Sequence, residues 1–432
     1  MKKEIKIAIL GAGTVGGGTV KVLRDNAEVI EKRLGAGIVI KKILVRSLKK
    51  ERSELKEFSL TDDFAEILRD EEISVVVELM GGVDPAKDYM LQALRAKKSV
   101  VTANKDAVAA FGKELFAAAE ENGVDFLFEA SVGGGIPIIA PLKTSLAANK
   151  ITEIMGIVNG TTNYMLTKMS DDNADYAEVL SEAQRKGYAE ADPTADVEGL
   201  DAARKAAILA SIAFNTRVSL DDVFVEGITK ITAADIDYAK ELGFAVKLLA
   251  IGKNSPEYGI DVRVHPVFLP QSHPLAAVNG VFNAIFVRGD AIGKAMFYGP
   301  GAGAFPTASA VVSDIMEAAR DHLTQNFGRL HCTCYESKKI CPIEETVSSY
   351  YVRLLVSDKP GVLGTIATTF GHSEVSLKSV IQTRKASAGL AEIVAVTHAV
   401  KHKNILEALD NLRSLTTVKE VQNTIRVENT DE

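Results

Sequence analysis

Short apolar runs alternate with amphipathic segments over the first part of the chain. The runs are rich in β-branched residues and fall at 5–10, 38–45, 73–79, 99–101 and 124–128. Runs of this length are typical of buried strands, and the segments between them have helical spacing. Strands that alternate with helices indicate a doubly wound parallel sheet, so we predict an α/β domain over 1–130.

The pattern changes twice further along the chain. Residues 131–304 mix strands, polar turns and helices without a regular repeat, which indicates an α+β domain. A long alanine-rich helix is predicted at about 305–325, and we expect it to pack back on the first domain. After a polar linker at 326–349, residues 350–432 follow β-α-β-β-α-β order, which is typical of a ferredoxin-like unit.

Composition narrows the class of protein. The 432 residues are 47% hydrophobic and 25% charged, with a formal net charge of −7 and no basic block, which argues against a nucleic-acid partner. No apolar stretch is long enough to span a bilayer, and no signal-peptide pattern opens the chain. The three cysteines are too few to staple a chain of this size. We therefore expect a cytoplasmic protein without a membrane partner.

A glycine-rich turn joins the first strand to the first helix. Its glycines stand in G-x-G-x-x-G order: one for the tight turn, one for the approach of a pyrophosphate, and one for close helix–strand packing. The phosphates would lie at the helix N-terminus, in a Rossmann-type site. The alternative is a purely structural glycine turn. The candidate site comprises Gly11, Ala12, Gly13, Thr14, Val15 and Gly16.

Two basic residues follow predicted strands at the sheet edge where ligands of parallel sheets bind. Arg46 stands where an acidic side chain would bind the ribose of NAD and a basic one accommodates the 2′-phosphate of NADP. NADP is therefore the favoured cofactor, with NAD possible; a solvated basic loop is the alternative. Lys105 points toward the same crevice, although a surface lysine fits the sequence equally well.

Two further glycine-rich segments carry candidate chemistry. The run Gly133–Gly135 lacks the Gly-Lys-Ser/Thr of a P-loop, but Glu129 with nearby loop carbonyls could chelate a hard cation. The segment Tyr298–Ala304 precedes the alanine-rich helix, and packing of that helix would close this turn over the cofactor.

The densest group of polar residues runs from Gly187 to Asp201 and leads into a helix. Asp201 is predicted as the N-cap of this helix and stands four residues before Lys205, so the two side chains share a face. Alanines flank Lys205, which would leave it partly desolvated and suited to general acid–base catalysis. An ordinary helical ion pair in solvent is the alternative.

The cysteines lie in the polar linker. His331, Cys332, Cys334 and Cys341 are possible zinc ligands, but the C-x-C spacing lacks the usual two-residue knuckle. A linker with incidental thiols is the favoured interpretation, and sensitivity to oxidation stays open.

Six motifs are spread over nearly the whole chain. They are GAGTVGGGT at the first turn, TANKD at Thr102–Asp106, EASVGGGIPII at Glu129–Ile139, NGTTNYML at Asn159–Leu166, GYAEADPTADVEGLDAARK at Gly187–Lys205 and YGPGAG at Tyr298–Gly303. Together they resemble the homoserine dehydrogenase family, in its long form with a C-terminal ACT domain. DKPGVL at Asp358–Leu363 is similar to the ligand turn of ACT domains.

This resemblance implies an NAD(P)H-dependent reduction of L-aspartate 4-semialdehyde to L-homoserine, in the biosynthesis of threonine, isoleucine and methionine. It implies Lys205 as proton donor and Lys105 as a second catalytic or substrate-orienting lysine. A regulatory amino acid, threonine by preference, would bind the ACT domain, and we expect a homo-oligomer, a dimer or a tetramer.

The resemblance also assigns ligand contacts. Carboxylates suit the α-ammonium group of the substrate, and lysines suit an alkoxide-like transition state. The implied substrate contacts are Gly187, Glu190 and Asp201. The implied cofactor contacts beyond the first turn are Lys105, Arg46, Gly301, Ala302 and Gly303. The implied ligands of a structural sodium ion are Glu129, Val132, Gly134 and Ile136.

Two other functions fit parts of the sequence. A hydroxyacid dehydrogenase with an ACT domain would carry its glycine fingerprint in mid-chain and use a histidine acid–base, whereas here the fingerprint opens the chain and lysines dominate. A non-catalytic amino-acid sensor could keep the dinucleotide fold, but Lys105, Glu190, Asp201 and Lys205 argue against it.

Overall fold

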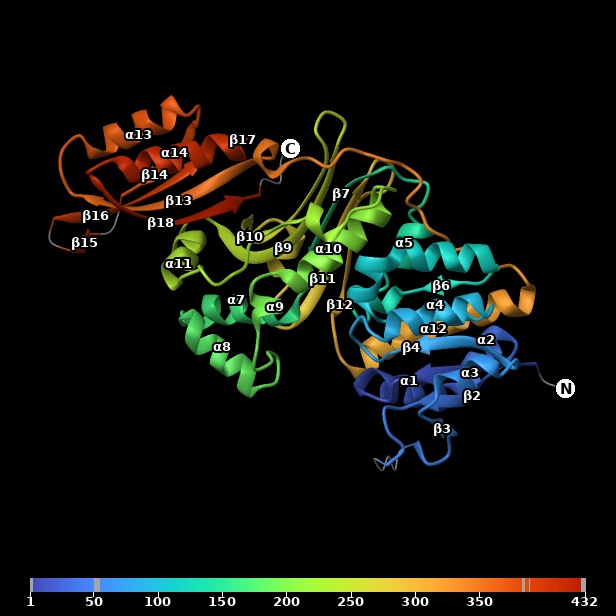
Figure 1. Ribbon diagram of the computed structural model, residues 1–432. Helices are drawn as coiled ribbons and strands as arrows, with labels where there is room; N and C mark the ends of the chain where they lie inside the picture. Colours follow the sequence, from blue (N-terminus) through green and yellow to red (C-terminus); the bar gives the residue numbers. More distant parts are fainter. Residues whose placement is uncertain (1–2, 50–54, 383–384, 388, 429–432) are drawn as a thin grey trace. The chain divides into compact units, whose positions relative to one another are not determined.

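The chain divides into two compact units in the computed structural model (Figure 1). The structure describes residues 3–49, 55–382, 385–387 and 389–428, with the backbone alone at 385–387. The first unit comprises 1–154, 207–221 and 283–337, and the second comprises 155–206, 222–282 and 338–432.

A parallel sheet forms the centre of the first unit. Its strand order is β3-β2-β1-β4-β5-β6, and every neighbouring pair is parallel. This is the order of a doubly wound sheet, so the predicted fold class is confirmed. The strand expected at 124–128 is shorter than predicted. The strands are β1 (Glu4–Leu10), β2 (Gly37–Leu44), β3 (Leu60–Thr61), β4 (Ile73–Glu78), β5 (Ser99–Thr102) and β6 (Phe126–Leu127).

Helices from both ends of this unit's sequence pack together and on the sheet. Helix α12, drawn in orange in Figure 1, returns from far along the chain to pack on α1, β4 and β5, whereas α4 packs on α5. The helices are α1 (Thr14–Asp25), α2 (Ala27–Leu34), α3 (Phe64–Arg69), α4 (Ala86–Arg95), α5 (Lys105–Asn122), η2 (Glu129–Ser131), α6 (Ile139–Lys143) and α12 (Ala304–Thr324). Strands β11 (Phe282–Gly289) and β12 (Gly293–Pro300) precede α12.

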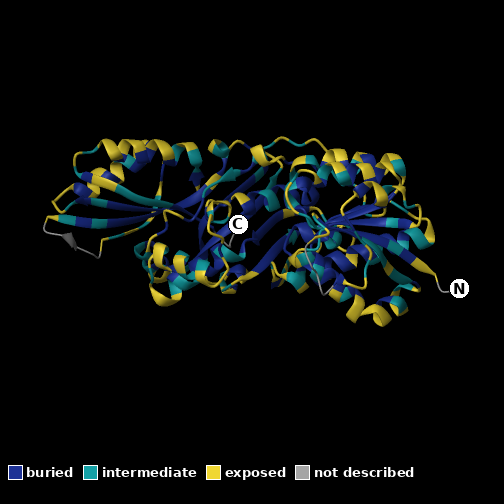
Figure 2. Ribbon diagram, turned by 60° about the horizontal axis from the view of Figure 1, so that its bottom comes forward, coloured by how far each residue is buried: buried dark blue, intermediate teal, exposed yellow. Residues whose placement is uncertain are grey.

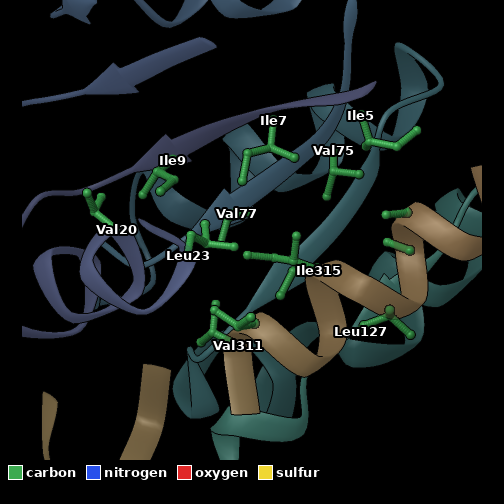
Figure 3. Close-up of a cluster of buried hydrophobic side chains, with 14 of the residues drawn as sticks. Ile5, Ile7, Ile9, Val20, Leu23, Val75, Val77, Leu127, Val311 and Ile315 are labelled. Atoms are coloured by element: carbon green, nitrogen blue, oxygen red, sulfur yellow. The ribbon is translucent and has the colours of Figure 1, made fainter. Parts of the chain in front are cut away.

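The core of the first unit explains why α12 returns. Figure 3 shows Ile7 of β1 and Val75 and Val77 of β4 with Val311 and Ile315 of α12 in one cluster of buried side chains. Full burial of each such side chain contributes roughly 1.5–3 kcal/mol, so the apolar face of α12 supplies several kcal/mol to the sheet that it covers.

The second unit begins with a mixed set of helices and strands. Strand β7 (Ile151–Ile157) starts in the first unit and ends in the second. Helix α10 starts in the second unit and ends in the first. Long antiparallel strands β9 and β10 follow the helices. The elements are α7 (Gly160–Asp172), α8 (Tyr176–Arg185), α9 (Thr194–Val197), α10 (Leu200–Ala213), η3 (Leu220–Asp222), β8 (Phe224–Val225), α11 (Ala233–Glu241), β9 (Phe244–Ser255), β10 (Gly259–Pro270) and η4 (Pro274–Ala277).

The C-terminal part of the second unit has the predicted β-α-β-β-α-β order. Its main strands pair antiparallel in the order β18-β13-β16-β14, the arrangement of a ferredoxin-like unit. Its elements are η5 (Ile343–Glu345), β13 (Val347–Ser357), α13 (Val362–His372), β14 (Leu377–Ile381), β15 (Lys385–Ser387), β16 (Leu390–Thr397), β17 (Val400–Lys401), α14 (His402–Ser414) and β18 (Val418–Val427).

A buried ionic network joins this C-terminal part to α11 within the second unit. Arg353 Nε of β13 donates to Asp235 Oδ1 (2.9 Å), and Arg353 Nη1 donates to Glu392 Oε1 (3.0 Å). Strand β18 also pairs in parallel with β10, through Val267 and Arg426. The sequence pattern predicted neither contact, because each joins residues far apart in the chain.

Burial follows the elements (Figure 2): strands are largely buried, drawn in dark blue, and the outward faces of helices are exposed, drawn in yellow. Across the described ranges, no helix is both long enough and apolar enough to cross a membrane.

Candidate active site

The glycine turn after β1 is shaped by close backbone contacts. Gly11 has a φ of +102°, and a Cβ atom added to it would lie 2.8 Å from Leu79 O. A Cβ atom on Gly16 would lie 2.1 Å from Gly11 O, so α1 packs on the turn more closely than any side chain permits. A Cβ atom on Gly13 would meet no described heavy atom within 4 Å. Open space therefore faces the turn where a pyrophosphate would approach.

The N-terminus of α1 is prepared for an anion. Gly13 is the N-cap and supplies no side-chain cap, so the amides of the first turn, from Thr14 onward, remain available to a ligand. Gly11 N donates to Leu44 O (3.0 Å), which holds the end of β2 beside the turn. Arg46, two residues later, is exposed. The turn thus fits a dinucleotide phosphate.

A buried carboxylate lies beside the glycine turn at Gly81 and Gly82, which follows β4. Glu78, the last residue of β4, is fully buried and accepts hydrogen bonds from Met80 N (2.7 Å) and Thr102 Oγ1 (2.6 Å). Burial raises the pKa of its carboxyl group. Asn104 Nδ2 donates to Gly82 O (2.5 Å). Sequence analysis overlooked Glu78, although a carboxylate at the end of a strand with three successive valines was the available signal.

Lys105 is the first residue of α5 and is half-buried. It follows the N-cap Asn104, whose Oδ1 accepts a hydrogen bond from Ala107 N (3.0 Å). Because α5 starts just after β5, Lys105 stands at the carboxyl edge of the sheet, where β1 also ends in the glycine turn.

Glu129 anchors the loop that carries the three glycines. Its carboxylate accepts hydrogen bonds from three successive amides at the start of α6, at Ile138 (2.6 Å), Ile139 (2.8 Å) and Ala140 (2.6 Å). Burial raises the pKa of this carboxyl group. Glu129 N donates to Asp314 Oδ2 of α12 (2.8 Å), which fixes the loop to the returning helix.

This loop packs against the turn before α12. A Cβ atom on Gly134 would lie 2.3 Å from Gly301 O, and Gly135 N donates to Pro300 O (3.2 Å). Gly303, with a φ of +125°, is the N-cap of α12, and Ala304 O lies 2.6 Å from where Gly18 would carry a Cβ atom. The structure therefore brings the Gly133–Gly135 loop, the turn at 301–303 and α1 into one packed region.

A lysine–carboxylate pair lies on α10 in the second unit. Lys205 Nζ donates to Asp201 Oδ2 (2.6 Å) and to Val158 O (2.7 Å), and both side chains are about nine-tenths buried. Asn159 Nδ2 donates to the same Asp201 oxygen (2.9 Å) and to Asp196 Oδ1 (2.7 Å). The Lys205 ammonium group is therefore held in place by the Asp201 carboxylate and the carbonyl group of Val158.

The predicted N-cap role of Asp201 is wrong. Helix α10 begins at Leu200, so Asp201 lies inside its first turn. Its carboxylate accepts hydrogen bonds from Lys205 and Asn159 instead. Sequence analysis did not assign Asn159 a role; its place directly after β7, as the N-cap of α7, was the signal.

The other predicted substrate contacts lie in an exposed turn after α8. Gly187 has a φ of +75°, and Glu190 is exposed. Thr161 Oγ1 donates to Tyr188 O (2.6 Å), which ties this turn to the start of α7, two residues from Asn159. The described hydrogen bonds include none between the Glu190 carboxylate and the Asp201–Lys205 pair.

The described residues hold no cluster of three or more His, Cys, Asp or Glu side chains that could bind a metal ion. The three cysteines form no disulfide.

Family comparisons agree with this architecture. The model described as "Homoserine dehydrogenase, NAD binding domain" matches residues 11–129, the model "Homoserine dehydrogenase" matches 137–316, and "ACT domain" matches 350–416. The dinucleotide turn, the doubly wound sheet and these matches define the class: an NAD(P)-dependent oxidoreductase acting on a CH–OH group.

Close relatives narrow the class. A homoserine dehydrogenase from Synechocystis is 48% identical, with 98% of this chain and 99% of that protein covered. A crystal structure of a homoserine dehydrogenase from Thiobacillus denitrificans has a TM-score of 0.94 at 42% identity, with 99% of both chains covered. The chain belongs to the homoserine dehydrogenase family.

A more distant structure is that of a hyperthermophilic archaeal homoserine dehydrogenase mutant in complex with NADPH. Its TM-score is 0.64 at 27% identity, with 76% of this chain and all of that chain covered.

Proposed function

We propose that the protein reduces L-aspartate 4-semialdehyde to L-homoserine, in the biosynthesis of threonine, methionine and isoleucine. The observation that carries the proposal is the buried ammonium group of Lys205, held by Asp201 and Val158 O. A protonated lysine held in a dry site can donate to the oxygen of an aldehyde as negative charge develops there. NADPH, when bound, supplies the hydride that reaches the aldehyde carbon.

The remaining site residues bind and orient the substrate. Glu190 and Asp201 offer carboxylates to the α-ammonium group, and Gly187 offers main-chain contact from an exposed turn. Lys105 serves as a second cation for the substrate or the developing oxyanion. Asn159 is a positioning residue, because it acts through Asp201.

NADP is the proposed cofactor. Gly11–Gly16 would bind the pyrophosphate and Arg46 the 2′-phosphate, with the turn of Gly301, Ala302 and Gly303 beside the cofactor. The exposed guanidinium beyond β2 supports this assignment, as does the NADPH complex of the archaeal relative.

A sodium ion is the proposed occupant of the Glu129 loop. Its ligands would be Glu129 and the carbonyl groups of Val132, Gly134 and Ile136, an oxygen-only set that suits a hard cation. The three amides that hold the Glu129 carboxylate support this role, because they fix the position of a buried carboxylate beside the glycine loop.

Threonine is the proposed regulatory ligand of the ACT domain. A cavity of about 530 Å³ lies where β8 meets α14 and β18, and the predicted ligand turn Asp358–Leu363 is not part of its described lining. Its lining includes Lys230 and an ion pair between Arg426 and Glu226 (3.2 Å), so both signs of charge border the cavity, as a free α-amino acid requires. The Arg353–Asp235 ion pair offers a route by which binding could reach α11.

The proposed assembly is a homo-oligomer, a dimer or a tetramer, in the cytoplasm. Ile292, Met296 and Tyr298 are exposed apolar side chains on or beside β12, an edge strand, and a second copy would cover them. The three free thiols suit a reducing compartment.

The deciding experiment follows the oxidation of NADPH by its nicotinamide absorbance. L-aspartate 4-semialdehyde is the substrate in one assay and a 2-keto acid in a parallel assay. Turnover of the semialdehyde alone is expected. Preference for the keto acid would indicate a hydroxyacid dehydrogenase, and no turnover with either would indicate a sensor. Inhibition by threonine that Glu226→Gln relieves, with basal turnover kept, tests the regulatory site.

A further inference from the structure

The proposed function leaves the C-x-C segment after α12 without a role, yet its two thiols are closely surrounded by polar groups. Arg217 Nη2 donates to Cys332 Sγ (3.4 Å). Cys334 Sγ lies 3.7 Å from its acceptor Ser211 O, near the end of α10. All of these residues belong to the first unit.

A second cation stands beside the same segment. Lys143 Nζ donates to Leu330 O (3.1 Å) and to His331 O (3.0 Å), and it lies over the rings of Phe116 (4.7 Å) and Phe128 (5.1 Å). Lys143 and Arg217 thus place positive charge on the side of the segment that carries both thiols. Positive charge near a thiol favours its thiolate, which is the nucleophilic form.

The two thiols interact with one another and differ in acidity. The neighbouring Cys334 thiol, together with the positive charges of Arg217 and Lys143, lowers the pKa of Cys332. The neighbouring Cys332, together with burial, raises the pKa of Cys334. Cys332 is therefore the more acidic thiol of the pair.

The thiolate is also within reach of a small molecule. Cys332 lines a cavity of about 350 Å³ bounded by Glu120, Asp125 and His331. It also lines a narrow crevice with Cys334, Lys143 and Arg217. Cys332 therefore borders both cavities, so a reagent in the larger one lies beside it, and Cys334 is among the residues that line the crevice.

We propose that Cys332 and Cys334 form a reactive dithiol that reduces low-molecular-weight disulfides of the glutathione type. The Cys332 thiolate attacks one sulfur of the small disulfide; a mixed disulfide forms and one small thiolate leaves. Cys334 then loses its proton to water and attacks Cys332 Sγ, and the second small thiolate leaves. The protein pair is oxidised to a Cys332–Cys334 disulfide, and the small disulfide is reduced to two thiols.

The test uses the reduced full-length protein with oxidised glutathione at neutral pH, followed by intact mass and peptide mapping. Wild type is expected to lose two hydrogens at the Cys332–Cys334 peptide. Cys334→Ser, which keeps a hydrogen-bond donor, is expected to stop at one glutathionyl group on Cys332. Cys332→Ser is expected to react at least about tenfold more slowly. Cys341→Ser is the matched control and should behave as wild type.

A second measurement does not depend on any variant folding. Iodoacetamide at mildly acidic pH should alkylate Cys332 at least about tenfold faster than Cys341 in the native wild-type protein, because burial raises the pKa of Cys341. Equal labelling of the two cysteines would overturn the proposal, as would a stable mixed disulfide in wild type that Cys334 never resolves.

Discussion

The first unit builds its candidate cofactor site from backbone, and the second unit builds its candidate catalytic site from side chains. Around the turn at Gly11–Gly16, what matters is the absence of Cβ atoms and the free amides of α1. Around Lys205, what matters is a buried ammonium group with a carboxylate and a carbonyl at hydrogen-bond distance.

The two sites should therefore be sensitive to different kinds of substitution. A backbone site is damaged by adding atoms, because its shape depends on close approach. A side-chain site is damaged by removing atoms, because a buried charge left without its partner costs several kcal/mol. Substitutions of opposite kinds should therefore separate the two sites.

The largest effect is expected for Lys205→Ala. Removing the proposed proton donor should lower kcat by about 10³-fold, within the range for general acid catalysis, while NADPH binding measured by fluorescence stays normal. Lys168→Ala is the matched control, since Lys168 forms an i,i+4 pair with Asp172 on the more exposed α7. Turnover near that of wild type in Lys205→Ala would refute the mechanism.

The backbone site should respond most to Gly16→Ala. The new Cβ atom would lie 2.1 Å from Gly11 O, and overpacking of this kind costs about 1–3 kcal/mol, which is up to ~100-fold in NADPH affinity. Gly17→Ala is the control from the same helix turn: its Cβ meets nothing within 4 Å, so it should raise the melting temperature slightly. If the two variants behaved equally in NADPH titration and thermal melting, the turn at Gly11–Gly16 would not be the dinucleotide site.

Arg46→Asp tests the one side chain on which the backbone site is proposed to depend. Loss of a charge-assisted contact with the 2′-phosphate should raise the KM for NADPH by roughly 30-fold and leave the KM for NADH nearly unchanged. Arg33→Asp, at an exposed position of α2, controls for the change in net charge. An equal rise in the KM for NADPH and the KM for NADH would show that Arg46 does not bind the 2′-phosphate.

The smallest effect is expected for Asn159→Ala. Asp201 would lose one of its two described partners, so kcat should fall by about tenfold, the equivalent of one hydrogen bond to a charged group. Because Asn159 also caps α7, thermal melting must be measured alongside. Asn122→Ala, which removes a local bond to Ala118 O, is the control. Loss of stability without loss of kcat would make Asn159 a structural cap only.

Local patterns in the sequence were enough to predict much of this. The i,i+4 spacing placed Asp201 and Lys205 on one helical face, and the structure has their charged atoms 2.6 Å apart. The glycine spacing predicted the turn before α1, and alternating strands and helices predicted the doubly wound sheet. Each of these signals arises from residues a few positions apart, where helix or strand geometry fixes the outcome.

The sequence pattern did not predict the long-range contacts. Asn159 reaches Asp201, Arg353 reaches Asp235, and Gly134 packs on Gly301, each across many residues of chain. Periodicity carries no information about such pairs, since it reports which face of an element is apolar and not what that face meets.

By itself, the sequence determined the order of elements, the glycine turn that admits a dinucleotide, the shared face of Asp201 and Lys205, and, through its motifs, the family. Only the tertiary structure decided that the returning helix α12 packs on β4 and β5, that Glu78 and Glu129 are buried on backbone amides, and that Cys332 shares a crevice with Lys143 and Arg217. The physical reason is that backbone geometry acts locally, whereas burial and charge pairing depend on which distant segments pack together.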